Sequence, residues 1–443
     1  MIKLLILAYD FPPYVSVGGL RPYNWYKYFK RMGIEPVVIT RQWSNKYGNH
    51  LDYIAAGDSD QIQTEKTEFG TIVRAPYRPN LANRLMLKYG EHKYHFIRKI
   101  ISAWYEVMQW FFITGPKASL YRAADDYLKH HPVDAIIATG DPFVLFRYAN
   151  RLSRKYNLPW VADYRDPWSH NYEKGNQSWL HPFYQWLEKK HVRSASAITT
   201  VSDFLKFKIS QLHPSVPIHI LPNGYDPEAI EPARLIKPPS DRLRFGFVGT
   251  IYDWHPWRSM IQVFAQFCKA HPDVLFEVNF YGINKEEEIK QEIYHEAPAL
   301  QDILHISGRM PNDQLLMELG SNHVMLLFNY YSYMGTKIFD YLGLRRLMVL
   351  CYAEDEEALQ LKKKYYRIEE VEGISKQQQA DLIKATNSGI IVKDARHFYQ
   401  VLEDLFQEFQ TTGGIACHSK NIENYSRVHQ VKELAELVKE IVK

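Results

Sequence analysis

The stretch from Gly335 to Gly343 holds the residues of this chain whose types and spacing favour chemistry most. It reads Gly-Thr-Lys-Ile-Phe-Asp-Tyr-Leu-Gly and lies between two short apolar runs, 324–328 and 347–350. This pattern predicts a strand, a loop, a helix and a second strand, so the helix would begin at the carboxyl edge of a parallel sheet. At that edge, unpaired N–H groups and the positive end of the helix dipole face any bound anion.

Lys337 and Asp340 are the two charged residues of this stretch. Lys337 would lie in the first helical turn beside the anion, and Asp340, three residues later on the same face, could accept hydrogen bonds from neighbouring hydroxyls. A phosphate joined to a hydroxyl-rich sugar is a nucleotide, so the pair indicates a nucleotide site. The same spacing also occurs in weak, exposed Lys–Asp pairs that bind nothing, and the two residues alone leave both readings open.

Gly18, Gly19 and Arg21 form a second candidate group, between the first predicted strand and a helix expected over 22–32. Glycines at a strand-to-helix turn let the backbone approach a ligand closely, and the helix start behind them favours anions. Arg21 could add a bidentate grip. Many such turns use glycine only for its backbone freedom, so a phosphate role is one of two interpretations.

A third group, Asp163, Arg165 and Asp166, follows an apolar strand. Charges at the carboxyl edge of a sheet point to the place where open α/β folds bind ligands, which favours a function here. The alternative is a simple Arg–Asp pair that ties a loop to its domain. In the second half of the chain, the strand 243–248 leads into Gly249 and Thr250, another strand followed by a glycine.

Length and pattern predict an α/β protein with two Rossmann-like βαβ domains that face each other across a cleft. The chain has 443 residues, too many for one ordinary core, and short apolar runs alternate with helical patterns on both sides of a polar, proline-bearing linker near 232–244. We therefore expect an N-terminal domain over 1–235, a second domain over 241–420, and a C-terminal helix within 421–443 that packs back on the first domain.

Composition and charge narrow the class of protein. The net charge of +4 is too small to argue for nucleic acid, and Cys268, Cys351 and Cys417 have neither metal-like spacing nor an even number. No stretch is long and apolar enough to span a bilayer, and the N-terminus reads as a buried strand rather than a signal peptide. We expect a cytoplasmic protein that binds no metal and no nucleic acid.

Several stretches in order resemble the family-four glycosyltransferases of the GT-B fold. Their order and spacing, rather than any one of them, carry the resemblance over nearly the whole chain. The matching stretches are 11–19, 163–168, 199–202, 221–224, 247–249, 307–311 and 336–342.

The resemblance implies retaining transfer of a sugar from a UDP- or GDP-sugar to an acceptor hydroxyl, with no cofactor or metal required. The first domain would be the acceptor side and the second would bind the donor, in bacterial polysaccharide or glycolipid biosynthesis. The residues implied to be catalytic are Arg165, Asp166 and Lys337. Arg165 falls where many relatives carry a His. The residues implied to bind the donor are Gly18, Gly19, Arg21, Gly249, Thr250, Arg309, Thr336, Lys337 and Asp340.

The sequence also departs from the family pattern. Many members carry two Glu separated by seven residues, whereas Ser332 and Asp340 stand at these positions. The usual cations after Gly249 are missing, and Arg309 could compensate for them. These departures keep two alternatives open: a nucleotide-sugar 2-epimerase of the same fold, and a non-catalytic protein that binds a nucleotide or glycan.

The segment 84–113 mixes basic residues with aromatic ones. Relatives often act on lipid-linked glycans, so a basic, aromatic surface helix could make peripheral contact with the inner membrane surface. The favoured alternative is an ordinary buried helix pair, because charges opposite an apolar face describe most globular helices.

Overall fold

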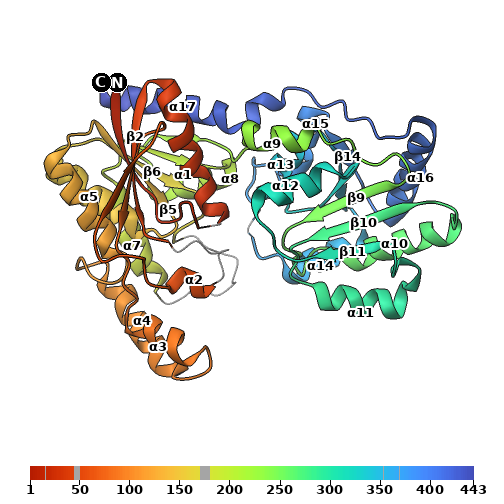
Figure 1. Cartoon of the computed structure of the whole chain (residues 1–443), viewed down its shortest axis with the longest axis horizontal. Coiled ribbons are helices and arrows are strands. Elements are labelled where there is room, and N and C mark those ends of the chain that lie inside the picture. The colour runs from red at the N-terminus through yellow and green to blue at the C-terminus, as the bar shows by residue number, and fades with distance from the viewer. Residues whose placement is uncertain (15, 44–49, 170–179, 353, 369) are drawn as a thin grey trace. The chain divides into compact units, whose positions relative to one another are not determined.

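A computed structural model describes residues 1–14, 16–43, 50–169, 180–352, 354–368 and 370–443. These residues form two compact units. The first comprises 1–169, 180–222 and 427–443, and the second comprises the described residues from 223 to 426. Each unit is built around one mostly or wholly parallel sheet (Figure 1). The predicted fold class, α/β with two Rossmann-like domains, is confirmed.

The first unit contains a sheet in the order β3-β4-β2-β1-β5-β6-β7-β8, parallel except for the β3–β4 pair. Runs such as Leu4 to Leu7 are buried on both faces, as expected for parallel strands covered by crossover helices. The strands are β1 (Ile2–Leu7), β2 (Ile34–Arg41), β3 (Gln63–Lys66), β4 (Thr71–Ala75), β5 (Ala135–Gly140), β6 (Trp160–Tyr164), β7 (Ala197–Thr200) and β8 (Ile218–Ile220).

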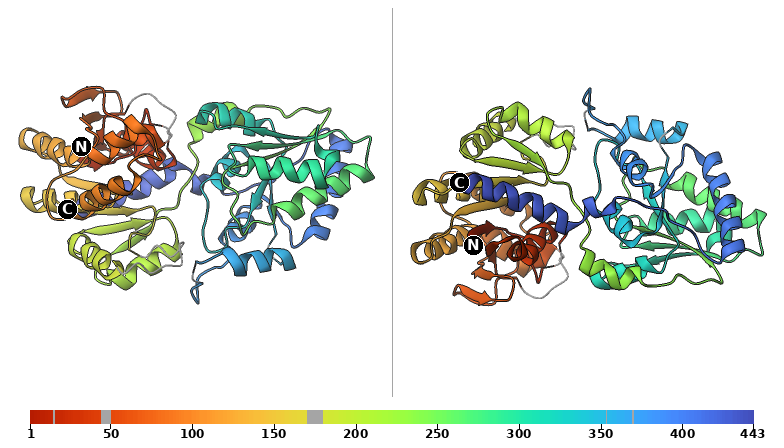
Figure 2. Two further views of the ribbon diagram at one scale, coloured as in Figure 1. Left: turned by 90° about the horizontal axis from the view of Figure 1, so that it is seen from below. Right: turned by 90° about the horizontal axis from the view of Figure 1, so that it is seen from above.

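The helices of this unit include the last helix of the chain, which the two views of Figure 2 show beside the N-terminal strand. Its residues Val431, Leu434 and Val438 share one apolar core with Leu4 and Ile6 of β1. The helices are α1 (Val17–Tyr28), α2 (His50–Ile54), α3 (Leu81–Tyr89), α4 (His95–Met108), α5 (Ala118–His130), α6 (Val144–Tyr156), α7 (His181–Val192), α8 (Asp203–Leu212) and α17 (Arg427–Val442).

Helix α1 begins earlier than the sequence predicts. It was expected from Pro22, but Ser16 caps it by accepting a hydrogen bond from the N–H of Gly18, so the helix starts at Val17. Gly18 and Gly19 therefore lie in the first helical turn rather than in a loop. Helix α8 begins in the same way, because the Ser202 hydroxyl accepts a hydrogen bond from the N–H of Leu205.

The second unit contains a fully parallel sheet in the order β11-β10-β9-β12-β13-β14, with helices on both faces. Its strands are β9 (Leu243–Val248), β10 (Phe276–Tyr281), β11 (Leu304–Ser307), β12 (Val324–Phe328), β13 (Leu347–Cys351) and β14 (Gly389–Ile391). Its helices are α9 (Pro227–Arg234), α10 (Trp257–Ala270), α11 (Glu286–Glu296), α12 (Asn312–Gly320), α13 (Lys337–Leu344), α14 (Glu356–Tyr365), α15 (Gln378–Thr386) and α16 (Ala395–Thr412).

The division between the units falls between residues 222 and 223, earlier than the linker expected from composition. Helix α9 belongs to the second unit because it packs against α12 and α13. Its Ile230 and Ala233 lie in the core beneath α13. Pro232, at the start of the expected linker, instead lies inside this helix, and Pro227 begins it.

Helices α3 and α4 correct a second expectation. The sequence favoured a buried pair, but they project from the first unit as a hairpin, and most of their apolar side chains are exposed. Within the described chain, no helix has the length and apolar character needed to cross a bilayer.

Candidate functional site

Both sheets reverse their winding direction at one place. In the first unit the chain runs outward from β1 through β2 to β4, then returns to the other side of β1 and continues from β5 to β8. In the second unit the reversal lies between β9 and β12. Open α/β sheets bind ligands at the carboxyl ends of the strands on either side of such a reversal. A ligand is therefore expected at the segments that follow β1, β5, β9 and β12.

In the second unit, strands β9 and β12 separate toward their carboxyl ends. Among the described residues, β12 is aligned with β9 only at Val324 and Met325. Farther along, the N–H of Val248 donates instead to the hydroxyl of Tyr341, 2.9 Å away and fully buried on α13. Tyr341 thus ties the segment after β9 to the helix after β12. This role of Tyr341 was not predicted from the sequence.

Helix α13 begins where the sequence predicts, with Thr336 before it and Lys337 as its first residue. Lys337 Nζ lies 3.0 Å from Asp340 Oδ2, and each side chain is about one-fifth exposed. The first turn therefore presents a cation, a carboxylate and free backbone donors, as expected. The two side chains pair with each other, so a ligand phosphate would have to compete with Asp340 for Lys337.

Gly249 and Thr250 directly follow β9, and Thr250 is exposed. Gly249 has a φ of +122°, a conformation that side chains rarely adopt, and no atom lies within 4 Å of where a Cβ would be. Arg309 follows β11, two strand positions from β9, or roughly 10 Å across the sheet. Its side chain is exposed, and it makes no hydrogen bond or ion pair within the described chain.

An aromatic cluster surrounds these segments. Tyr252 and Trp254 stack with ring centroids 4.3 Å apart, and both rings contact His255, which stacks on Phe328 at the end of β12. Burial lowers the pKa of His255 to about 3, so this ring is neutral. It accepts a hydrogen bond from the N–H of Tyr252. The cluster fixes the segment after Gly249, a role that sequence reasoning missed.

Ser332 occupies the place of the first family Glu. It is 2% exposed, and its backbone N–H donates to the Tyr366 hydroxyl. The same hydroxyl donates to the carbonyl of Tyr330. A buried serine held in this way supplies no carboxylate to a ligand, so the departure read from the sequence is a departure in the structure too.

Arg21 does not have the ligand role that the sequence suggested. It is 2% exposed, and its Nε and Nη2 donate to the buried carboxylate of Asp163, with Nη2 2.9 Å from Oδ1. Its Nη1 donates to the carbonyl of Leu221. The hydroxyls of Thr139 and Thr199 also donate hydrogen bonds to the Asp163 carboxylate. This bidentate grip is internal and joins α1, β6 and the end of β8, so Arg21 is removed from the candidate site.

Arg165 lies at the carboxyl edge of the first sheet. Its Nε and Nη2 donate to the carbonyls of Gly140 and Asp141, at 2.6 and 2.9 Å. Its Nη1 lies beside Gly18, where an added Cβ would be 2.3 Å from that nitrogen. The structure therefore brings Gly18 and Arg165 together, although they are far apart in sequence. Asp166 follows Arg165 with an exposed side chain.

Carboxylates outnumber cations at this edge. Asp10 and Asp166 each interact electrostatically with Arg165 and with a third carboxylate, Asp141. Burial raises the pKa of Asp10, and the hydrogen bond from Ser16, 2.7 Å from Oδ2, opposes that rise. In the part of the chain that is described, Asp10 Oδ1 is buried without a partner. This surplus of negative charge suits hydroxyl groups better than a phosphate.

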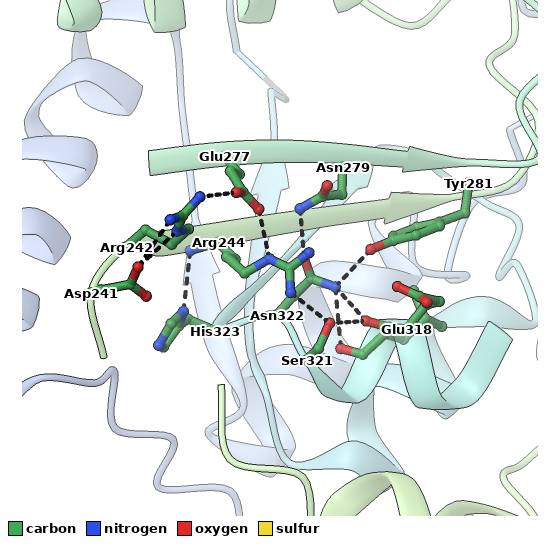
Figure 3. Close-up of polar contacts among 11 residues, drawn as sticks. Asp241, Arg242, Arg244, Glu277, Asn279, Tyr281, Glu318, Ser321, Asn322 and His323 are labelled. Carbon is green, nitrogen blue, oxygen red and sulfur yellow. Dashed lines mark hydrogen bonds and ion pairs between the residues drawn. The ribbon is translucent and has the colours of Figure 1, made fainter. Parts of the chain in front are cut away.

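A buried polar network in the second unit was also missed (Figure 3). Arg244 near the start of β9 contacts Glu277 on β10, 2.9 Å away, and its backbone N–H donates to His323. Asn322 donates to the Tyr281 hydroxyl and to a carbonyl of α12. Arg244 and Glu277 lie near the amino ends of their strands, opposite the edge where ligands bind, so the network serves to hold α12 on the sheet.

The described residues contain no group of three side chains able to hold a metal ion.

A family model matches part of this chain. Residues 21–229 match the model of Glycosyltransferase Family 4. The match confirms the resemblance to family-four glycosyltransferases and supports a function of the glycosyltransferase type. Among curated proteins, none matches the chain.

Solved structures are similar to both units. Sucrose-phosphate synthase from Thermosynechococcus elongatus has a TM-score of 0.57 at 12% identity, covering 100% of this chain and 96% of its own. A UDP-forming α,α-trehalose-phosphate synthase from Burkholderia xenovorans has a TM-score of 0.59 at 12% identity, covering 100% of both chains. An E. coli trehalose-6-phosphate structure bound with UDP-2-fluoro glucose has a TM-score of 0.55 at 10% identity, covering 99% of this chain and 96% of its own. At such identities the similarity establishes the fold, GT-B.

Proposed function

We propose that this protein is a retaining glycosyltransferase that moves a sugar from a nucleotide-diphosphate sugar to an acceptor hydroxyl. The observation that carries the proposal is the position of Lys337. It stands at the first turn of α13, beside the winding reversal of the second sheet, and Tyr341 of the same helix holds the segment of Gly249 and Thr250. The resemblance to a nucleotide-sugar family adds the chemistry that this geometry would serve.

The donor, a UDP- or GDP-sugar, would lie on the second unit. Its diphosphate would take the place of Asp340 as the partner of Lys337, with the N–H groups of α13 and the backbone at Gly249 as further donors. Thr250 and Arg309, both exposed at the same edge, would contact the phosphates. Asp340, released from Lys337, would accept hydrogen bonds from the ribose hydroxyls.

The departing group, a nucleoside diphosphate, needs stabilisation of charge more than a strong acid. Lys337 and the helix start supply that charge. In the step we propose, the acceptor oxygen bonds to the sugar carbon on the face that the phosphate leaves. The bond from this carbon to the phosphate oxygen breaks, and its electron pair stays on the diphosphate. The same phosphate oxygen takes the acceptor proton, so no metal and no nucleophilic carboxylate are required.

The acceptor would lie on the first unit. Arg165 and Asp166 stay our candidates for contact with the transferred sugar and the acceptor, with Gly18 and Gly19 beside them. The surplus of carboxylates around Arg165 leads us to assign these residues to hydroxyl groups rather than to phosphate, which is one of the two interpretations that the sequence leaves open for the glycines. A glycan or lipid-linked glycan is the acceptor class that we propose, in polysaccharide or glycolipid synthesis at the inner membrane surface of a bacterium.

One experiment separates this function from its alternatives. The full chain is incubated with UDP-, GDP-, ADP- and dTDP-sugars, with and without a mixture of glycan acceptors, and thermal stabilisation and nucleoside diphosphate release are followed. A transferase releases diphosphate in an acceptor-dependent way. Turnover of the donor alone into its epimer would assign the protein to the 2-epimerases. Stabilisation without turnover would leave a nucleotide-binding protein, and no binding of any donor would overturn the proposal.

A further inference from the structure

The hairpin of α3 and α4 exposes apolar side chains on an unusual scale. Phe96 is 74% exposed, Ile100 57% and Trp104 53%. These three residues are spaced by four, so they form one stripe along α4, widened by Ile97 at 50%. Apolar residues at this spacing normally face a core. Here these side chains are exposed instead, on a helix that packs against α3 in a hairpin projecting from the first unit (Figure 1).

The residues around the stripe are basic. Segment 81–112 contains five Lys and Arg and two Glu, a net charge of +3, while the whole chain carries only +4. Lys88, Lys93 and Lys99 are exposed. Arg98 is the exception, since it is buried and donates to the carbonyl of Glu91, which closes the turn between the helices. The hairpin that exposes these apolar side chains therefore carries a net positive charge.

The loop that follows α4 anchors the hairpin firmly to the first unit. Trp110 is buried and stacks on Trp168, 4.9 Å away, and on His191. The carbonyl of Phe111 accepts a hydrogen bond from Arg147 of α6. Phe112, immediately after it, is 63% exposed and continues the apolar surface. The hairpin that carries the exposed apolar side chains is therefore fixed to the first unit by buried contacts.

We propose that the α3–α4 hairpin docks on an anionic lipid bilayer, with the stripe of Phe96, Ile97, Ile100 and Trp104 inserted at the interface. A helix with aromatic and aliphatic residues on one face and lysines at its borders has the composition of an interfacial anchor. Lysines beside it attract anionic headgroups. A second copy of this chain is a poorer occupant, since two hairpins of net charge +3 would repel each other.

This surface extends the proposed function, since an acceptor carried on a lipid would be met at the same interface. Vesicle binding, however, does not depend on donor binding, so the two proposals fail separately.

Co-sedimentation of the full chain with vesicles tests the proposal. We expect binding to phosphatidylcholine mixed with phosphatidylglycerol, weaker binding to phosphatidylcholine alone, and loss of binding as salt rises. The double variant Ile100→Ser/Trp104→Ser should abolish binding. Its control, Leu275→Ser/Tyr294→Ser, removes apolar residues that are 61% and 73% exposed in the second unit and should leave binding unchanged.

Two double lysine variants separate the electrostatic contribution to vesicle binding from the apolar contribution. Lys93→Gln/Lys99→Gln should weaken binding to the anionic vesicles by about fivefold per lysine at low salt, and Lys269→Gln/Lys420→Gln should not. An unchanged midpoint of thermal unfolding in all four variants, measured without donor, shows that they fold. Failure of the wild-type chain to bind anionic vesicles, or equal binding by Ile100→Ser/Trp104→Ser, overturns the proposal. Self-association of the wild-type chain that these serines abolish would assign the stripe to a second copy instead.

Discussion

At the carboxyl edge of the first sheet, Arg165 lies among three carboxylates, whereas at the carboxyl edge of the second sheet the candidate residues are Lys337 and Arg309 with one carboxylate, Asp340. The two edges have the same topology and opposite charge balance. Topology therefore determines where each unit offers a site, and the charges determine which ligand suits it. A diphosphate matches the second edge, and hydroxyl groups match the first.

Burial sharpens the same comparison. Arg21–Asp163 and Lys337–Asp340 are both ion pairs of candidate residues at a carboxyl edge, but the first is 2% and 0% exposed and the second 22% and 20%. A fully buried pair with every oxygen occupied holds the fold together and offers nothing to a ligand. A half-buried pair costs little to open. The sequence alone shows both pairs as charges near glycines.

The largest effect is expected from breaking the buried pair. Asp163→Ala leaves the Arg21 guanidinium buried without its carboxylate, which should lower the free energy of unfolding by about 3–5 kcal/mol. Urea denaturation measures this change, and donor binding by the folded fraction should persist. If the variant keeps its stability and loses turnover, the pair belongs to the site and our division of the two pairs is wrong.

A somewhat smaller effect is expected from pH. Burial lowers the pKa of His255 to about 3 and of His323 to about 4, both in the second unit. An unfolded chain binds protons on these rings below its pKa of about 6.5, and the folded chain does not. The contribution of these two histidines to the free energy of unfolding is therefore complete above pH 6.5 and is lost as the pH falls toward 4. For His255 the loss is roughly 3 kcal/mol.

Among the described residues of the first unit, His191 is the one histidine whose pKa is lowered, by burial, to about 4. The raised pKa of Asp10 acts in the opposite sense, because it favours the folded chain as the pH falls. The second unit should thus open first in acid, as hydrogen exchange at pH 5 and pH 7.5 would show after correction for intrinsic rates. His255→Asn/His323→Asn, which keeps an acceptor at each Nδ1 position, should flatten the dependence. A first unit that opens before the second would contradict this assignment.

A still smaller change is expected at Tyr341. Tyr341→Phe removes the acceptor for the N–H of Val248, which should cost about 1 kcal/mol of stability. Because this contact joins the segment of Gly249 to α13, donor affinity should fall as well, while the packing of the ring is kept. Calorimetric titration of the donor checks it, with Tyr294→Phe, an exposed tyrosine on α11, as the control.

Much of the fold followed from the sequence because parallel strands are short, continuous apolar runs, as in β9 and β12. The position of α13 followed for the same reason. The start of α1 was missed, because the cap at Ser16 was read as part of a loop. The role of Arg21 was missed because its partner Asp163 is distant in sequence, and the exposure of α4 because an apolar stripe has the same pattern whether it faces a core or solvent.

The central claim is that Lys337 holds the donor diphosphate, and calorimetric titration of UDP and GDP into wild-type, Lys337→Ala and Lys290→Ala chains tests it most directly. Lys290 pairs with Glu286 on α11 and serves as the matched control. We predict that Lys337→Ala weakens nucleotide binding by at least about tenfold, while the free energy of unfolding changes by no more than about 1 kcal/mol. Equal affinity of the wild-type and Lys337→Ala chains for the nucleotide that binds would contradict the account.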